Sequence, residues 1–149
     1  MYYDILKAIK DTLSEDSFVN TVSTGSIYDF DLKKQTMFPL SHIIVNNVNY
    51  NSNVFTFNIS IIFADVVDIS KEEVVDYFVG NDNLHDIHNT QLMVANRFLD
   101  LFNRGDIRKD GYELTGTPSL EPFDDRFENG VAGWTLTFDL VVKNDMTIC

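Results

Sequence analysis

The clearest pattern in the chain is an alternation of apolar and polar side chains near its C-terminal end. One side of this stretch holds Trp134, Leu136, Phe138, Leu140 and Val142. A period of two predicts a β-strand with one buried face. The preceding residues, from Glu121, include Pro122 and Asn129-Gly130, which favour a loop and a turn. We therefore expect Glu121–Val142 to form a charged loop, a turn and the central strand of the sheet.

A second strand pair is predicted in the middle of the chain. His42–Tyr50 is rich in Ile and Val, and Val54–Ala64 places Phe and Ile on alternate positions. Between them lies Asn51-Ser52-Asn53, a turn sequence, because Asn tolerates positive φ and bonds the local backbone. Together these features predict a long β-hairpin.

Helical spacing appears twice. Met1–Leu13 repeats apolar residues every three or four positions, and His85–Asn103 does so with a longer stripe, made of Ile87, Gln91, Val94, Ala95, Phe98, Leu101 and Phe102. Two shorter strands are expected at Phe18–Val22 and Tyr112–Leu120. In the second, Gly116 and Pro118 favour an edge or a bend.

The order of these elements is α-β-β-β-α-β-β. It predicts an α+β fold in which helices cover one face of an antiparallel or mixed β-sheet. A length of 149 residues suits a single domain spanning residues 1–149.

Composition and charge narrow the function classes. The net charge of -12 disfavours wrapping around nucleic acid, because phosphate binding needs clustered Lys and Arg. The single cysteine, Cys149, is the last residue, so no internal disulfide can form. No apolar run is long enough to cross a bilayer and no signal peptide opens the sequence. We expect a soluble, acidic domain made in the cytoplasm, with no membrane contact.

Candidate metal ligands can be assembled from several acidic and imidazole side chains. His85 and His88 share a helix face and could join Asp82 or Asp86. Zinc takes three or four protein ligands, so two solvated polar residues are the simpler interpretation. A second acidic group could hold calcium or act as general acid and base, but turn chemistry explains it more simply: Asp124, Asp125, Glu128 and Asn129. Asp29 and Asp31 receive the same interpretation.

Catalytic signatures are missing from the sequence. It has no nucleophile elbow, P-loop, dinucleotide glycine motif or zinc-protease pair. Phe55, Phe57 and Phe63 lack the surrounding cations that a base-stacking platform needs. We expect no catalytic residue, no cofactor and no metal, and therefore no enzyme.

The full order of elements resembles a known group of viral proteins. The resemblance rests on the N-terminal helix, a turn at Gly25, FPLSHIIV at Phe38–Val45, VFTFNISIIFAD at Val54–Asp65, NRFLDLF at Asn96–Phe102 and the final EPFDDRFENGVAGWTLTFDLVV. It is similar to the neck and tail-completion proteins of tailed bacteriophages, namely tail-terminator-like and head-to-tail connector ring proteins, including those of crAss-like phages.

This resemblance implies a non-enzymatic virion component of the neck or tail, assembled in the host cytoplasm. Such a protein forms a six- or twelve-fold ring with copies of itself at the junction of portal and tail. Its partners are the neighbouring portal, connector and tail proteins, and DNA passes through the ring without specific binding. The acidic composition agrees with a channel that does not grip DNA.

Two other function classes stay open at this point. One is a cytoplasmic domain that binds a small molecule between helix and sheet. The other is a metal- or nucleotide-dependent enzyme, which the missing motifs disfavour. Native size separates them: a ring protein is a large closed oligomer or a monomer that assembles on a portal, whereas a small-molecule binder is a monomer or dimer whose melting temperature shifts with metabolites.

The connection Val66–Asn83 is long for a compact domain and too apolar for a solvated loop. Ser70 and Glu73 could form a capping box for a short core helix ending at Phe78. The alternative is an arm that packs on a neighbouring subunit, with a candidate interface of Val74, Val75, Tyr77 and Phe78.

Changing these four interface residues to serine together tests the arm. If the segment is an arm, the circular dichroism spectrum and the melting temperature of the monomer should barely change, while ring formation should be lost. Unfolding of the monomer would instead assign the segment to the core.

Overall fold

The computed structural model describes residues 2–25, 38–67, 78, 83–104, 111–124 and 130–143. Within them the order of elements is α1 (Tyr2–Ser14), β1 (Thr21–Thr24), β2 (Leu40–Tyr50), β3 (Val54–Val66), α2 (Leu84–Arg104), β4 (Tyr112–Phe123) and β5 (Val131–Lys143). The predicted α+β class and the predicted order are therefore confirmed. No helix among these residues is long and apolar enough to span a membrane.

Five strands form one mixed sheet in the order β1-β2-β3-β5-β4. The first strand is parallel to its neighbour and the other pairs are antiparallel. The middle strand is therefore β3, and the prediction that the last strand is central was wrong. The reason is topological: β4 adds outside β5, which leaves β5 one position from the edge.

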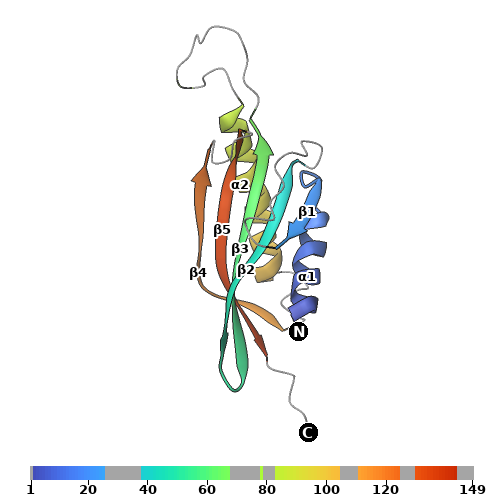
Figure 1. The fold of residues 1–149 in the computed structure, drawn as a ribbon, viewed down its shortest axis with the longest axis vertical. Helices are drawn as coiled ribbons and strands as arrows, with labels where there is room; N and C mark the ends of the chain where they lie inside the picture. Colours follow the sequence, from blue (N-terminus) through green and yellow to red (C-terminus); the bar gives the residue numbers. More distant parts are fainter. Residues whose placement is uncertain are drawn as a thin grey trace.

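Both helices lie on the same face of the sheet (Figure 1), as predicted. The main core lies between them and the sheet. It is formed by Ile5, Ile9 and Leu13 of α1, Val94, Ala95, Phe98 and Phe102 of α2, and Ile43, Phe57, Ile59, Ile61, Phe63, Leu136, Phe138, Leu140 and Val142 of the strands. A smaller cluster is made of Phe38, Leu40, Ile62, Ala64, Phe123 and Val131.

Two predicted boundaries were wrong. The first strand begins at Thr21 rather than Phe18, because Asp16 holds a turn: its carboxylate accepts the Phe18 amide at 3.0 Å, and its carbonyl accepts the Val19 amide at 3.1 Å. In addition, Glu121–Phe123, predicted as loop, belong to β4 and pair with β5. That strand is a sheet edge with a register break between Thr115 and Ser119, as Gly116 and Pro118 suggested.

Trp134 lies on the helix-covered face, as the alternation predicted, but it is half-buried rather than buried. Its indole Nε1 donates a 2.8 Å hydrogen bond to the carbonyl of His88 on α2. The His88 ring meets the indole edge-on, with 5.8 Å between ring centroids. Trp134 therefore ties β5 to the beginning of α2.

The neighbouring Gly133 leaves no room for a side chain between β5 and β3. A Cβ at this position would overlap the backbone carbonyl oxygen of Phe63. Gly133 also has a φ of 158°, and it pairs with Ala64 in the sheet. Glycine is required here because no side-chain atom fits between the two strands.

Gly133→Ala is expected to lower the free energy of unfolding by about 3 kcal/mol or more, since the obstacle is backbone and cannot rotate away. The matched control is Gly116→Ala. That glycine has a φ of 69° with open space around its Cβ, so only conformational strain of about 1–2 kcal/mol applies. Urea unfolding measures both, and equal losses would contradict the steric argument.

Candidate interaction surfaces

The hairpin of β2 and β3 projects beyond the helix layer (Figure 1). All eight residues from Asn46 to Asn53 are exposed, the longest such run in the described part of the chain. We call this segment the hairpin tip. Tyr50 is 72% exposed and Val48 41% exposed.

The apolar side chains of the hairpin tip continue the core rather than standing alone. Tyr50 pairs with Phe55, Phe55 with Val142, and Val142 with Tyr112, so one row crosses four strands. Opposite residues in paired strands share a face, which places this row on the helix-covered side. The side chains become more exposed toward the turn of the hairpin. Phe57 is buried beside Tyr2 of α1, whereas Tyr50 lies beyond the helices.

The hairpin tip is also uncharged. From Gln35 to Ala64 the sequence contains no Asp, Glu, Lys or Arg, although 11 basic and 23 acidic residues occur in 149. This signal was readable from the sequence, and sequence reasoning missed it because the stretch was interpreted only as strands. In an acidic chain, an exposed neutral projection is a surface that another acidic protein can approach.

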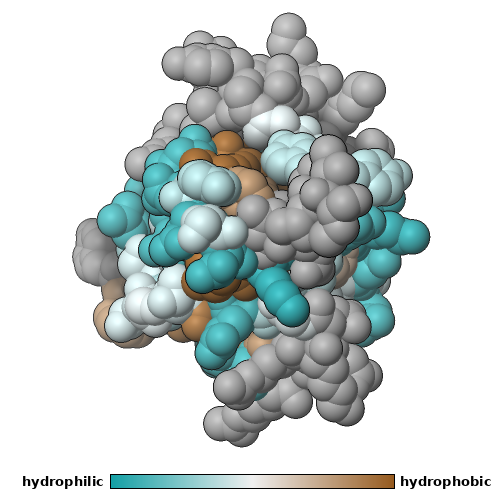
Figure 2. Space-filling view, turned by 90° about the horizontal axis from the view of Figure 1, so that it is seen from below, coloured by the Kyte–Doolittle hydropathy of each residue, from teal (hydrophilic) through white to brown (hydrophobic). Residues whose placement is uncertain are grey.

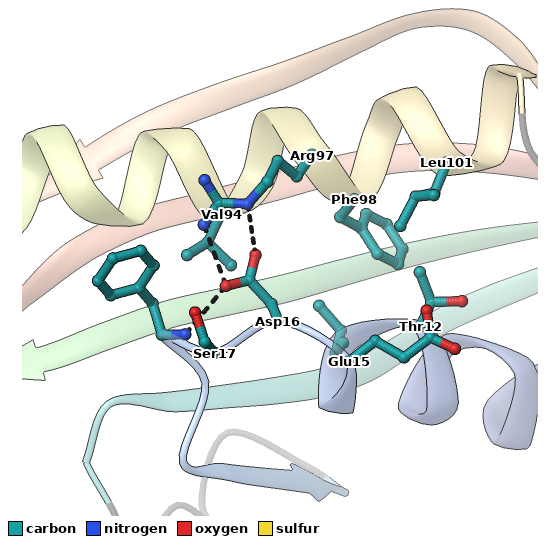
Figure 3. A pocket seen from close by; sticks show the side chains of 10 residues that line it. Thr12, Glu15, Asp16, Ser17, Val94, Arg97, Phe98 and Leu101 are labelled. Atoms are coloured by element: carbon teal, nitrogen blue, oxygen red, sulfur yellow. Dashed lines mark hydrogen bonds and ion pairs between the residues drawn. The ribbon is translucent and has the colours of Figure 1, made fainter.

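A cavity of about 370 Å³ opens between the end of α1, the following turn and α2 (Figure 3). Its floor is apolar and includes Leu13, Val94 and Phe98. Its rim carries Phe18 and Leu101, which are 50% and 40% exposed. The helix layer therefore has a hollow with an apolar rim.

An ion pair lies at this cavity. Arg97 Nε and Nη2 donate to the two carboxylate oxygens of Asp16 at 2.7 and 3.0 Å, a bidentate arrangement. The guanidinium also lies over the Phe18 ring, 5.5 Å from its centroid. Burial would raise the pKa of Asp16, but hydrogen bonds from Arg97 and the Phe18 amide, together with the Arg97 charge, lower it. This contact fastens the turn after α1 to α2.

A second cavity, of about 300 Å³, lies between α1 and the sheet. It is lined by Tyr3, Leu6, Lys7, Lys10, Asp11, Val22, Ser23, Thr24 and Ile43. The alternative function predicted from the sequence was a small-molecule site between helix and sheet. The volume of this cavity is at the lower end of the range of about 300–1,000 Å³ that is usual for ligand pockets.

The sheet face opposite the helices carries a polar network that crosses three strands. Asn46 Nδ2 donates to Asn58 Oδ1 and to Ser60 Oγ, both at 2.8 Å. Asn58 Nδ2 donates to Asp139 at 2.9 Å, and Ser60 Oγ lies 3.1 Å from Thr137 Oγ1. These side chains bond one another, which holds them flat against the sheet.

The two histidines considered as metal ligands have separate partners. His85 Nε2 donates to the Phe78 carbonyl at 2.8 Å, and its ring stacks on Phe78 with 5.5 Å between centroids. His88 Nε2 donates to the Phe123 carbonyl of β4 at 3.1 Å. Since a carbonyl only accepts, Nε2 of each ring carries its proton and does not face a metal. Among the described residues no group of three metal-ligating side chains comes together.

Several sequence candidates fall outside the described residues: Asp29, Asp31, Val74, Val75, Tyr77, Asp82, Asp125, Glu128 and Asn129. The predicted short helix at 70–78 does so as well, except for Phe78. Phe78 is described and 80% exposed, and Asp124 is also exposed. The proposed arm therefore stays a prediction.

The Asp16–Arg97 pair is expected to contribute a coupling free energy of about 1 kcal/mol at pH 7, since Arg97 is 39% exposed and partly screened. A double-mutant cycle with Asp16→Asn and Arg97→Gln, followed by urea unfolding, measures it. The folded-state pKa of Asp16 lies below 3.8, so the contribution is present above that pH and is lost as the pH falls through the folded value. A coupling near zero at pH 7 would contradict the structural role.

The described surfaces thus comprise a neutral projection, two cavities and a flat polar sheet face. In comparisons with known proteins, no family model and no curated sequence matches this chain. The function is therefore argued from these surfaces and from the sequence resemblance.

Proposed function

We propose that the protein is a structural ring subunit of a tailed-phage neck, placed at the head-to-tail junction around the DNA channel. The structural observation that carries the proposal is the neutral, exposed hairpin tip on a chain of net charge -12. The second support is the sequence resemblance to tail-terminator-like and connector ring proteins.

Charge explains why such a tip suits a ring. Every subunit of a homo-oligomer carries the same net charge, so contacts through acidic surfaces are repulsive. An uncharged projection allows two copies to meet without placing carboxylates against each other. Figure 2, viewed from the end at which the hairpin projects, shows hydrophobic surface between hydrophilic residues at this end.

Sheet-edge pairing is the less suitable route to assembly. The edge strand β4 contains Pro118 and Pro122, which lack a backbone N–H, and a register break after Thr115. Glu113 and Glu121 add charge to the same strand. These are the features that protect an edge against pairing with another chain.

The polar sheet face suits the wall of a DNA channel. The side chains of Asn46, Asn58, Ser60 and Thr137 are bonded to one another, and Asp139 adds negative charge. Among the side chains that the structure describes, the cations are Lys7, Lys10, Arg97 and Lys143, on the helices and at the end of β5. A surface of this kind repels phosphate rather than holding it, which lets DNA pass.

The purified protein is expected to form closed rings and to leave duplex DNA unbound at physiological salt. Mass photometry and negative-stain imaging measure the first, and gel shifts over a range of salt measure the second. A chain that stays monomeric at high concentration and also fails to assemble on a phage portal would overturn the ring. Nanomolar, salt-sensitive binding would overturn the passive channel, because it requires a basic face.

The second candidate function is binding of a small molecule, supported by the cavity between α1 and the sheet. Lys7 and Lys10 at its rim would favour an anionic ligand. A monomer whose melting temperature rises with anionic metabolites would favour this function over the ring.

A further inference from the structure

We infer that the ring contact is heterologous: the hairpin tip of one copy inserts into the cavity at Phe18 and Leu101 of a second copy. This inference rests on the proposed function and adds the two surfaces that touch. A cyclic ring requires two different patches on each subunit, and the structure offers a projection and a hollow on separate parts of the fold.

The hairpin tip carries an exposed aromatic side chain that can insert into a partner. Tyr50 and Phe55 lie side by side at the end of the hairpin, with ring centroids 5.6 Å apart. Tyr50 keeps 72% of its surface exposed, although its row belongs to the apolar side of the sheet. Aromatic side chains with a polar end are the commonest anchors of protein interfaces.

The cavity at Phe18 and Leu101 is large enough to receive an aromatic side chain. An engineered apolar cavity of roughly 150 Å³ accepts benzene, and this one has about 370 Å³. Phe18 and Leu101 are the exposed apolar residues that share this cavity, and its floor belongs to the main core. An aromatic ring can therefore enter against fixed walls.

Charge selects a second copy as the occupant. The tip carries neutral acceptor groups, namely the side-chain carbonyl of Asn53 and the Tyr50 hydroxyl. The cavity is lined by the carboxylates of Glu15 and Asp16 and by the Arg97 guanidinium, whose bonds to Asp16 use two of its three nitrogens. A partner other than a second copy would bind an acidic protein more readily through a positively charged surface of its own. A neutral tip avoids repulsion from Glu15 and Asp16 at this cavity, which suits contact between two copies that are both acidic.

The test compares self-association of the wild-type chain with three variants by mass photometry and sedimentation. Tyr50→Ser removes the anchor, and Leu101→Asp places a charge at the hollow. Asn49→Asp changes no size and adds one charge at the tip. Its matched control is Asn89→Asp on the exposed face of α2, away from both surfaces. Circular dichroism verifies that each variant is folded.

Tyr50→Ser, Leu101→Asp and Asn49→Asp are each expected to weaken association by roughly tenfold or more, as loss of an interface anchor does. The control is expected to assemble normally. Added salt should restore part of the association of Asn49→Asp, because its defect is charge repulsion.

Mixing the Tyr50→Ser and Leu101→Asp variants gives the most decisive test. The Tyr50→Ser chain keeps an intact hollow and the Leu101→Asp chain keeps an intact tip, so an equimolar mixture should form 1:1 dimers and stop there. Rings that are unaffected by the tip variants, or a mixture that forms no dimer, would overturn this inference and leave the proposed function standing. A wild-type chain that assembles neither with itself nor on a phage portal would overturn the proposed function itself.

Discussion

The pairing of β3 with β5 is the constraint on which the rest of the structure depends. The two strands are each 13 residues long and pair along their whole length, from Val54 with Lys143 to Val66 with Val131. Gly133 permits this pairing beside the Phe63 carbonyl, where a Cβ would overlap the carbonyl oxygen. Because the register is continuous, Phe57, Ile59, Ile61 and Phe63 share one face with Leu136, Phe138 and Leu140, and both helices must pack there.

The same pairing explains why the hairpin extends past the helices. The strands β2 and β3 run on to Tyr50 and Val54, while α1 begins beside Phe57. The apolar face of the sheet therefore continues for one further row without a helix above it. On the opposite face, Asn46, Asn58, Ser60, Thr137 and Asp139 satisfy one another, so that face is stable in water. One sheet thus carries an exposed apolar projection on its helix-covered side and a network of bonded polar side chains on its opposite face.

Distribution of charge connects this architecture to the proposed ring. Among the described residues, acidic side chains occur on both helices, in the turn after α1 and on β3, β4 and β5, whereas the hairpin tip has none. Asp16 is partly neutralised by Arg97, and this pair sits at the hollow that we propose as the receiving surface. In the proposed ring, a neutral tip lets two acidic chains meet where long-range repulsion between them is weakest.

The sequence by itself determined the α+β class, the order of elements and the positions of both long helices. Those features follow from periodicity, which is local: alternation at Trp134–Val142 and helical spacing at His85–Asn103 are readable without any partner. Tertiary structure decided which strand is central, because the place of β4 outside β5 depends on pairing between distant segments. It also decided the Asp16–Arg97 pair, whose residues lie 81 positions apart, and the start of β1 after the Asp16 turn. The neutral run from Gln35 to Ala64 was present in the sequence, but its importance depends on exposure. Only the fold shows that the hairpin tip extends past the helices and stays exposed to solvent. The reason is that burial depends on which elements pack nearby, and a local sequence pattern does not specify them.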